Sequence, residues 1–561
     1  MANKKKKSVP AHRPASKQRP ENTRAAAAGP GGFSPVFWTG AALALFAFLL
    51  YANTLGHGYV LDDPLAIGKN ELVKKGIGGI GELFGHHYRA GTEGAGASAL
   101  LYRPLSLVTF AIEWSLSPNS PGLGHFMNAL WYALTAAVGF AALRLLFQGY
   151  HWLWAAGAML LFAAHPLHTE VVANIKSRDE ILNLFFAMAA LYAWARWLEQ
   201  PAGKWLGLAL GAYFLALLSK ESAVTFLPVF PLASWFFFRK TARQSAGHAL
   251  LFAVPAVLFL VLRAAVLSHT TDNFVVSEMD NPIVTAQGFG ERSATSFMVL
   301  WKYFQLLLFP QPLISDYSFR HLTVVNWSNW QALAGLAVYA GLLVYSIRGL
   351  QRREALAFCT AAFLCGVALY SQLPLVIGTL LGERLMYAPS LWFCAAAAFL
   401  IWKISRFDLR EAAAQTGFPE MKKWSAGAGI LLVLALAMAA LTLRRNPDWA
   451  SNLALFSADV AKAPQSVRLH NGMGSELYAL VGREGISETE RNELLERMRQ
   501  HSQAGADIRP NPVSYLNLGN VAISKNQFAE AIANYQKALD QAPNYGLARI
   551  NIGRSYQAWG R

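Results

Sequence analysis

The chain has 561 residues, of which 54% are hydrophobic and 15% charged, and its formal net charge is +16. Long apolar runs with so few charges favour a polytopic membrane protein over a soluble one. The positive charge does not predict nucleic-acid binding, because it is concentrated in the N-terminal tail and in short loops between apolar runs.

The N-terminal 35 residues form a basic, Pro/Ala-rich tail ahead of the first apolar run. We expect residues 1–35 to be disordered and cytoplasmic, since Lys and Arg near membrane spans favour the inner side. Two further basic clusters, at 239–243 and 348–353, lie in short loops and follow the same rule. Together they predict an orientation for the whole chain.

Eleven apolar segments are predicted to span the bilayer, at about 37–52, 125–147, 152–166, 179–198, 205–219, 222–238, 247–266, 329–347, 355–375, 385–402 and 425–443. The segment 104–117 is too short to span, because 14 residues rising 1.5 Å each cover about 21 Å of a core roughly 30 Å thick. We expect this segment to be an interfacial helix on the outer face, and 294–309 to be a second interfacial or re-entrant helix there. Counting 104–117 as a span instead would place the basic cluster 239–243 outside, against the positive-inside rule.

The fold class expected is therefore all-α, with a membrane domain over 36–443 and an extracytoplasmic domain over 444–561. The second domain carries a helical repeat. Leu518 and Gly519 recur as Ile552 and Gly553, 34 residues later, which is the period of the tetratricopeptide repeat (TPR). Further positions of that pattern are Tyr515, Ala531, Tyr535, Ala538 and Pro543, and a degenerate earlier unit is expected over 464–510.

The predicted threading returns most of the unusual charged and histidine residues to the outer ends of the spans. A charge at a helix centre costs about 2.5–3.5 kcal/mol on insertion scales, so such residues either cap helices at the interface or form a site. The candidates are Asp62, Asp63, Arg103, His125, His165, His168, Glu170, Arg178, Glu180, Lys220, Glu221, Glu383 and Arg384. Arg178 and Glu180 belong to the stretch Lys176 to Glu180, which is polar throughout.

Simpler interpretations exist for several of these residues. Lys220 with Glu221, and Glu383 with Arg384, could be ordinary interfacial ion pairs. His165 and His168, at i and i+3, resemble a metal pair with Glu170, but no spacing supplies a third ligand, so a hydrogen-bonding role is favoured and no metal ligands are assigned. The segment Asp62-Asp63-Pro64 could be a turn. Convergence on one face is what favours a site.

Transfer from a lipid-phosphate donor would need such a set of side chains. Its phosphate leaves as an anion and needs Arg or Lys, while a hydroxyl acceptor needs a carboxylate base. A single displacement of this kind inverts the anomeric configuration of the sugar. We expect Asp62 and Asp63 to provide the base, with the pKa of one raised by the other.

The motifs together resemble a known family. Leu-Asp-Asp-Pro at 61–64 is followed by Tyr-Arg-Pro-Leu at 102–105, His-Phe-Met-Asn at 125–128, Ala-His-Pro-Leu-His-Thr-Glu at 164–170 and Ser-Arg-Asp-Glu at 177–180. Ser-Lys-Glu-Ser at 219–222, Glu-Arg-Leu-Met-Tyr-Ala-Pro-Ser at 383–390 and Asn-Pro-Asp-Trp at 446–449 complete the set. The combination is similar to the transmembrane and tetratricopeptide-repeat-containing (TMTC) protein O-mannosyltransferases.

The resemblance implies a GT-C glycosyltransferase of eleven spans that transfers mannose from a polyprenyl-phosphate donor to Ser or Thr hydroxyls of proteins. It implies that Asp62 or Asp63 is the catalytic base, with Asp62 favoured, and that Arg103 meets the donor phosphate. Arg178 and Arg384 match further phosphate-side positions. The remaining candidates match the cavity around them: His125, His165, His168, Glu170, Glu180, Lys220, Glu221 and Glu383. A short repeat array and a basic tail imply a bacterial inner-membrane protein with its repeats in the periplasm, or an endoplasmic reticulum protein if eukaryotic.

Two other functions remain open at this stage. One is a ligase or polymerase that moves whole lipid-linked glycans, and the other is a non-enzymatic repeat-bearing scaffold for secretion or envelope assembly. A transporter is disfavoured because transport sites lie near the midplane. The expected partners are membrane lipid, the lipid-linked donor and a polypeptide acceptor held by the repeats, with no nucleic acid. No cofactor is demanded, although the outer carboxylates leave room for a divalent metal.

Overall fold

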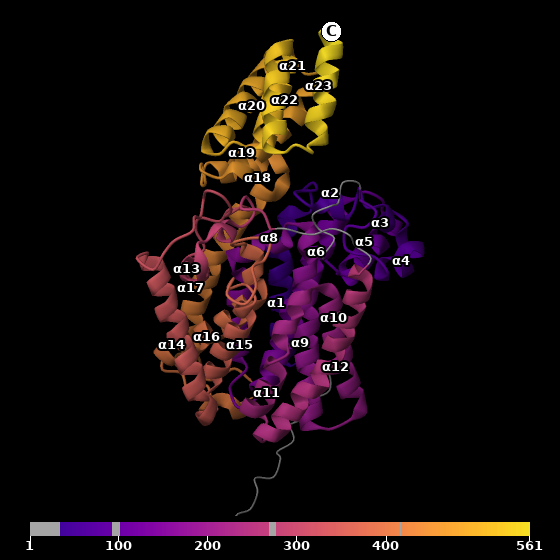
Figure 1. Ribbon diagram of the computed structural model, residues 1–561. Helices are drawn as coiled ribbons and strands as arrows, with labels where there is room; N and C mark the ends of the chain where they lie inside the picture. The colour runs from indigo at the N-terminus through magenta and orange to yellow at the C-terminus, as the bar shows by residue number, and fades with distance from the viewer. Residues whose placement is uncertain (1–33, 93–100, 269–275, 416, 561) are drawn as a thin grey trace, which may run out of the picture.

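The computed structural model describes residues 34–92, 101–268, 276–415 and 417–560 (Figure 1). The tail predicted over 1–35 lies almost wholly outside this part of the chain. Within the described ranges the protein is all-helical, as predicted, with a helical repeat domain standing on one end of a bundle of long apolar helices.

Each predicted span corresponds to a helix: α1 (Pro35–Leu50), α6 (Pro121–Leu146), α7 (Leu153–Ala164), α9 (Arg178–Glu199), α10 (Gly203–Ser219), α11 (Val229–Phe237), α12 (Ala242–Leu267), α14 (Trp330–Arg352), α15 (Ala355–Ala368), α16 (Tyr387–Ile404) and α17 (Met421–Arg445). In the described residues seven of these helices are long and apolar enough to cross a membrane, namely α1, α6, α9, α12, α14, α16 and α17. The other four are shorter apolar helices. The chain is thus a multi-pass membrane protein, while the count of eleven stays a prediction.

The two segments expected not to span form α5 (Pro104–Leu116) and α13 (Gly288–Leu308). The first ends at Leu116, one residue earlier than predicted. The second begins six residues before the predicted start at 294, because its first turn is polar and gives no apolar signal. Glu291 in that turn accepts a hydrogen bond from the Gln287 backbone N–H at 2.6 Å, which caps the helix where the hydropathy pattern is silent.

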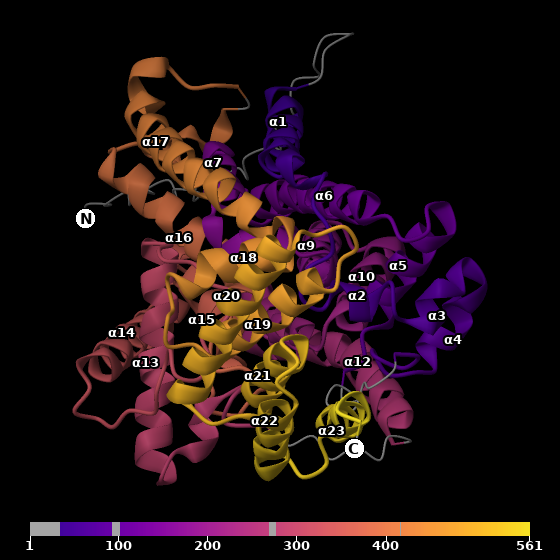
Figure 2. The ribbon, with the colours of Figure 1, turned by 90° about the horizontal axis from the view of Figure 1, so that it is seen from above.

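Burial separates the long helices into two groups. About two-thirds of the apolar window is buried in α6, α9 and α16, compared with about a quarter in α1, α12, α14 and α17. The first group therefore lies inside the bundle and the second faces outward, where lipid can cover the apolar side chains. The α9 helix is central, packing against both α6 and α10 (Figure 2).

A small outer lobe follows α1. It contains α2 (Asp63–Ala66), α3 (Glu71–Lys74) and α4 (Ile80–Phe84), which rest on α5 (Figure 1). Its apolar side chains make a separate buried cluster, including Ile67, Val73, Tyr88 and Phe110, that also holds Ile175 just before α9. This cluster fixes the loop of the two aspartates next to the start of α9.

The repeat domain consists of α18 (Asn452–Val460), α19 (Val467–Val481), α20 (Glu488–Ile508), α21 (Pro512–Ser524), α22 (Phe528–Gln541) and α23 (Gly546–Ala558). The α19–α20 and α21–α22 pairs are helical hairpins, and α23 is the first helix of a following copy. Gly519 lies flat against the ring of Tyr535, where a Cβ atom would approach within 2.3 Å. That close approach explains the small residue at this repeat position.

The repeat domain is tied to the bundle by charged contacts. Arg445, at the end of α17, donates to Asp459 from both Nη1 (2.6 Å) and Nη2 (3.1 Å), and Asp459 is fully buried. Arg468 pairs with Asp280 at 2.6 Å. The buried bidentate pair fixes the direction in which the chain leaves the last membrane helix.

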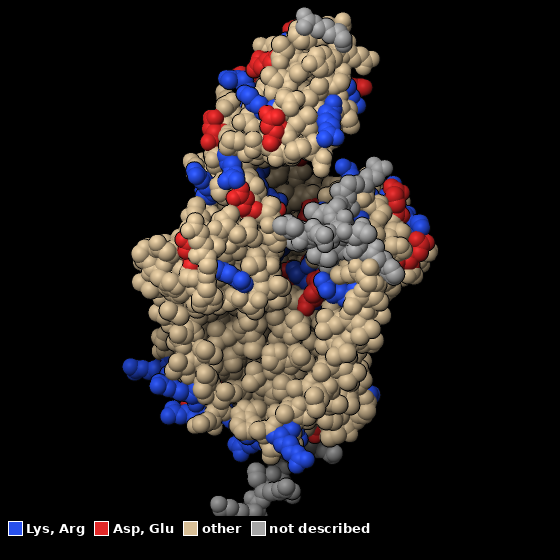
Figure 3. All heavy atoms as spheres, in the orientation of Figure 1, with Lys and Arg blue, Asp and Glu red and all other residues tan. Residues whose placement is uncertain are grey.

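The surface carries the charge pattern expected of a membrane protein. On the face shown in Figure 3, a broad band without charged side chains crosses the helical bundle, and Lys and Arg gather at the end away from the repeats. The 239–243 loop between α11 and α12 and the end of α14 supply basic residues of this kind. The repeat domain therefore lies on the side opposite the basic loops.

Candidate functional site

The adjacent aspartates have different environments. Asp63 begins α2 and is fully buried, whereas the Asp62 side chain is 48% exposed. The two carboxylates therefore do not act as an equivalent pair. Asp62 is open to solvent, and Asp63 faces into the protein.

Asp63 holds the backbone of two segments together. Its Oδ2 accepts the Val60 N–H at 3.0 Å and its Oδ1 accepts the Lys176 N–H at 2.7 Å. Burial raises its pKa to about 7 even though these N–H groups favour the charged form, and the charge of Asp62 adds a small further increase. The rise in one carboxylate's pKa was predicted from the pairing of the two aspartates, but burial is its larger cause.

Asp62 has the opposite shift. Its partial burial alone would raise the pKa, but Lys176, Arg89 and Arg384 outweigh that effect and hold the pKa below its ordinary value, with a smaller contribution from Arg468. Arg89 donates from Nη2 to Oδ1 at 3.1 Å. Asp62 is therefore an ionised, accessible carboxylate surrounded by cations.

Arg103, predicted to meet a phosphate, is engaged by two carboxylates. Its Nε donates to Glu221 at 2.9 Å and its Nη1 to Asp179 at 2.6 Å, and the side chain is only 10% exposed. Asp179 lies in the first turn of α9, where the helix dipole also stabilises negative charge. Two edges of the Arg103 guanidinium are thus already bound by carboxylates of the protein.

The Arg178 side chain is fully hydrogen-bonded within the protein. Its Nε donates to Asn128 at 2.7 Å, and Nη1 and Nη2 are shared among the Glu113 carboxylate, the Thr109 hydroxyl and the Gly124 carbonyl. The five N–H groups of a guanidinium all have partners, and the side chain is fully buried. The sequence predicts that Arg178 binds the donor phosphate, but no N–H group of its side chain is free to do so. Its contacts instead join α5, α6 and α9.

Arg384 has free donors. Its backbone N–H and its Nη1 both bind the buried Glu170, the first at 2.8 Å, and the side chain is 33% exposed. Among the described residues the structure gives its Nε and Nη2 no hydrogen-bond partner. Arg384 therefore combines a fixed base with a guanidinium edge available to an anion.

The other acidic candidates lie deeper. The sequence suggests an ion pair between the neighbours Lys220 and Glu221. In the structure Lys220, at the end of α10, instead pairs with Glu180 in α9. Glu383 does not pair with Arg384. Its Oε1 accepts from the Ile314 N–H (2.7 Å) and the Tyr317 hydroxyl (2.8 Å), so it anchors the segment after α13.

The histidines are all bound by the protein. His165 contacts the Leu307 carbonyl at 3.1 Å through Nε2 and accepts the Leu167 N–H through Nδ1. His168 has hydroxyl oxygens 2.8 Å from each ring nitrogen, and His125 contacts the Gly58 carbonyl at 3.2 Å. These contacts agree with the hydrogen-bonding role favoured for the pair.

A metal ion does not suit the donors present. In the described part of the chain no group of three or more His, Cys, Asp or Glu side chains is arranged to hold one. The accessible carboxylate, Asp62, already has cationic neighbours that neutralise it, which would repel a divalent ion.

A network of ion pairs surrounds Asp62. Five cations and five carboxylates are joined by ion pairs: Arg89, Arg103, Lys176, Lys220 and Arg384 with Asp62, Glu170, Asp179, Glu180 and Glu221. Figure 3 shows acidic and basic side chains together in a recess above the uncharged band. Glu170, Asp179 and Glu180 are each 1% exposed, whereas the side chains of Arg89 and Arg384 are 21% and 33% exposed.

Several of these residues were not singled out from the sequence. Lys176 and Asp179 fall inside the polar stretch 176–180, whose pattern predicts no particular role for either. Glu113 was a usable signal, because it is the single carboxylate in the apolar segment 104–117 and a lone charge there needs a partner. Nothing in the sequence distinguishes Arg89 from other loop arginines.

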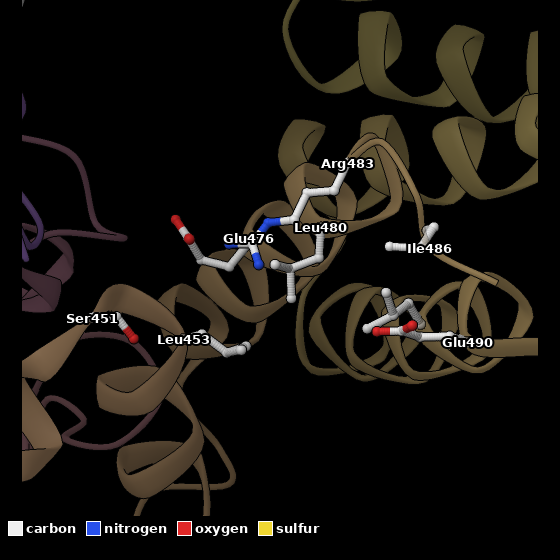
Figure 4. A pocket seen from close by; sticks show the side chains of 8 residues that line it. Ser451, Leu453, Glu476, Leu480, Arg483, Ile486 and Glu490 are labelled. Atoms are coloured by element: carbon white, nitrogen blue, oxygen red, sulfur yellow. The ribbon is translucent and has the colours of Figure 1, made fainter.

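The repeat side has its own pocket, of about 280 Å³, between α18, α19 and α20 (Figure 4). Its lining mixes apolar and charged side chains: Ser451, Leu453, Glu476, Leu480, Arg483, Ile486, Glu490 and Leu494. None of the predicted site residues lines it, so it is separate from the recess at Asp62.

Comparison with known proteins supports both parts of the chain. The tetratricopeptide repeat family matches residues 512–545, which confirms the predicted repeat. Protein O-mannosyl-transferase TMTC3 of Mus musculus is 25% identical over 540 residues, covering 91% of this chain and 55% of that protein. Protein O-mannosyl-transferase F38B6.6 of Caenorhabditis elegans is 25% identical and covers 76% of this chain and 58% of its own length.

The predicted resemblance to the TMTC protein O-mannosyltransferases is thus confirmed, and the chain spans a little over half the length of these relatives. Among solved structures, the archaeal oligosaccharyltransferase AglB of Archaeoglobus fulgidus, in complex with an inhibitory peptide and a dolichol-phosphate, is similar with a TM-score of 0.43 and 14% identity. It covers 82% of this chain and 59% of its own. A likeness at this level adds nothing to the assignment of the fold.

The contrast between the aspartates predicts different costs of neutralisation. In Asp63→Asn one amide nitrogen must face a buried backbone N–H, so we expect a loss of roughly 1–3 kcal/mol in unfolding free energy. Asp62→Asn, the matched control at the exposed position, should unfold within about 0.5 kcal/mol of the wild type. Thermal unfolding in detergent, followed by size-exclusion chromatography of the surviving fraction, measures both. Equal midpoints for the two variants would contradict the assigned difference.

Proposed function

We propose that the chain is an inverting membrane glycosyltransferase of the GT-C type that transfers one sugar, mannose, from a polyprenyl-phosphate donor to Ser or Thr hydroxyls of proteins. The reaction would take place on the extracytoplasmic side, beneath the repeat domain. In a bacterium this side is the periplasm, and in a eukaryote it is the lumen of the endoplasmic reticulum. The named relatives support the activity and the sugar.

The observation that carries the proposal is the environment of Asp62. It is the accessible member of the aspartate pair, it is ionised, and Arg384 and Lys176 act on it electrostatically. A carboxylate that removes a proton and cations that receive an anionic leaving group are the two requirements of this transfer. Both are met within one recess at the outer ends of the helices.

The proposed transfer is a single displacement. The acceptor oxygen forms a bond to the anomeric carbon as the bond from that carbon to the phosphate oxygen breaks. The hydroxyl proton passes to Asp62, and the departing polyprenyl phosphate keeps the bonding electron pair. Because attack and departure occur on opposite faces of the sugar, the configuration inverts.

We assign the leaving phosphate to Arg384 and Lys176. Arg384 keeps Nε and Nη2 free among the described residues, and Lys176 is 13% exposed with its nearest carboxylate oxygen, on Asp179, 3.7 Å away. Arg103 would support this pair from beneath through Asp179. Arg178, whose donors are all used, is given a positioning role in the helix packing.

The repeat domain is proposed to bring the polypeptide acceptor. Its helical hairpins stand over the recess (Figures 1 and 3), and repeat arrays present extended surfaces to peptides. The pocket lined by Glu476 and Arg483 has a volume on the scale of one or two side chains and could receive part of such a peptide.

Removal of the base tests the proposed function directly. Asp62→Asn keeps the shape of the side chain but removes its basicity, and we expect transfer to fall by at least about 100-fold. Mannose transfer from a short polyprenyl-phosphate mannose to acceptor protein is followed by mass spectrometry of the intact product. Asp540→Asn, at an exposed aspartate of the repeat domain, is the matched control.

A variant Asp62→Asn that transfers sugar at the wild-type rate would contradict the assignment of the base. Addition of an oligosaccharide in place of a single hexose would instead identify a glycan ligase. No mass change on any extracytoplasmic protein when the gene is deleted would favour a non-enzymatic scaffold.

The phosphate assignment predicts a second loss. Arg384→Gln combined with Glu170→Gln removes the ion pair without leaving a buried charge unpaired. Removing one donor to a developing anion should lower kcat/KM for the lipid donor by roughly 100- to 1000-fold. Arg410→Gln, at an exposed arginine of an inner loop, serves as the control. A double variant within threefold of the wild type would exclude Arg384 from the phosphate site.

The pH profile distinguishes the two aspartates. A base must be unprotonated, so activity is lost as the pH falls through its pKa. With Asp62, whose pKa lies below its ordinary value of 3.8, kcat/KM should stay level from pH 8 to pH 5. With Asp63, whose pKa is about 7, it would halve near pH 7 and fall about tenfold for each unit below. Initial rates in a constant-ionic-strength buffer series decide between them.

A further inference from the structure

We propose that Asn452, the first residue of α18 in the repeat domain, is a positioning residue that holds the loop of Asp62 in its working conformation. The inference rests on the proposed role of Asp62 as base. It adds a residue 390 positions away in the sequence, on the other domain, to the determinants of the transfer rate.

The loop needs an external restraint at Leu61. This residue has a φ of 48°, in the left-handed region that non-glycine residues seldom adopt. The left-handed conformation is unfavourable for leucine, because its Cβ atom then lies too close to the following carbonyl oxygen. Its N–H donates to the Asn452 side-chain oxygen at 2.7 Å. Since Asp62 is the next residue, the dihedral angles of Leu61 decide where the carboxylate points.

Asn452 is itself oriented by the repeats. Its amide nitrogen donates to Oε1 of Glu476, on α19, at 3.0 Å. Only the amide nitrogen can donate to a carboxylate, so the amide oxygen is left facing Leu61. Figure 4 shows the Glu476 carboxylate on the pocket rim, pointing away from Ile486 and Glu490. The bond between Glu476 and Asn452 thus connects the repeat pocket to the catalytic loop.

Other contacts hold the two ends of the same loop. The Gly58 N–H donates to the Ala450 carbonyl at 3.0 Å. Val60 and Leu61 pack into a small apolar cluster with Trp449, and Asp63 is bound by backbone N–H groups on the far side. The loop is held on both sides of Leu61. Loss of the hydrogen bond from Leu61 to Asn452 would therefore change mainly the dihedral angles of Leu61, and so redirect the side chain of Asp62.

Asn452 is not needed to keep the domains together. The pairs Arg445 with Asp459 and Arg509 with Glu278 join the repeat side to the membrane side without touching the loop of Asp62. Loss of the Asn452 side chain should therefore change the loop and leave the domain in place. This separation allows a positioning role to be distinguished from a structural one.

The test compares Asn452→Ala with Arg509→Ala, a contact of the same interface remote from the loop. We expect Asn452→Ala to lower kcat about 10- to 100-fold, with KM for the lipid donor within twofold and the unfolding midpoint near that of the wild type. Arg509→Ala should leave kcat within twofold. The readout is steady-state mannose transfer by the full chain in detergent.

Second-site variants should restore the activity lost on changing Asn452. Adding Leu61→Asn should restore at least a third of the lost kcat, because asparagine adopts left-handed angles several times more readily than leucine. A second rescue uses the contact with Glu476. Asn452→Asp should lose activity, because two carboxylates would then face each other. Adding Glu476→Gln should recover the activity, because its amide nitrogen can donate to the new carboxylate. A structural role alone would give neither rescue.

The outcomes separate the two proposals. If Asp62→Asn is inactive and Asn452→Ala keeps kcat within twofold of the wild type, the positioning role is overturned and the proposed function stands. If Asn452→Ala loses kcat but neither rescue recovers any, the positioning role is likewise overturned. If Asp62→Asn is itself fully active, the assignment of Asp62 as the base fails, and the positioning role that rests on it fails with it.

Discussion

The arrangement of the outer site follows from one constraint, which is that ionised side chains taken out of water at the ends of membrane helices must find partners. Glu170, Asp179 and Glu180 are each about 1% exposed, and every one of them has a cationic partner. These pairs join different elements, so the same contacts that neutralise charge also hold the start of α5 and the end of α10 against α9, and Arg384, just before α16, against Glu170. The price of burying the carboxylates is offset by pairing, and the accessible cations are left rigidly placed.

Rigid placement is what a leaving phosphate would require. Donors that are already oriented need no reorganisation when negative charge develops, and they act more strongly where water is partly excluded. The contrast between Arg178 and Arg384 follows the same principle. Every N–H group of the Arg178 side chain is hydrogen-bonded within the protein. Arg384 binds Glu170 through one side-chain nitrogen, and the other edge of its guanidinium is available to a ligand. An arginine at the outer end of a helix can thus serve either the packing or the chemistry, depending on how many partners surround it.

Sequence patterns predicted the class of fold well because hydropathy and the 34-residue period are local signals. The apolar runs predicted the seven long apolar helices, and Leu518 with Gly519 predicted the repeat. The partners of the charged residues could not be predicted in this way. That Arg178 meets Glu113 rather than a phosphate, and that Lys220 meets Glu180 rather than Glu221, depends on how α5, α9 and α10 pack. The Asn452 contact to Leu61 joins residues 391 positions apart and leaves no local trace.

The different fates of Asp62 and Asp63 have a common origin in the left-handed turn at Leu61. Two adjacent carboxylates could share one proton if their oxygens faced each other. Here both oxygens of Asp63 are bound by backbone N–H groups of Val60 and Lys176, so they are turned away from the recess. Only Asp62 faces the place where a sugar and its acceptor would meet. A double displacement with retention needs a nucleophile and a separate acid-base group on that recess, whereas a single displacement needs one base. The geometry of the pair therefore agrees with the proposed single displacement, in which one accessible carboxylate serves as the base.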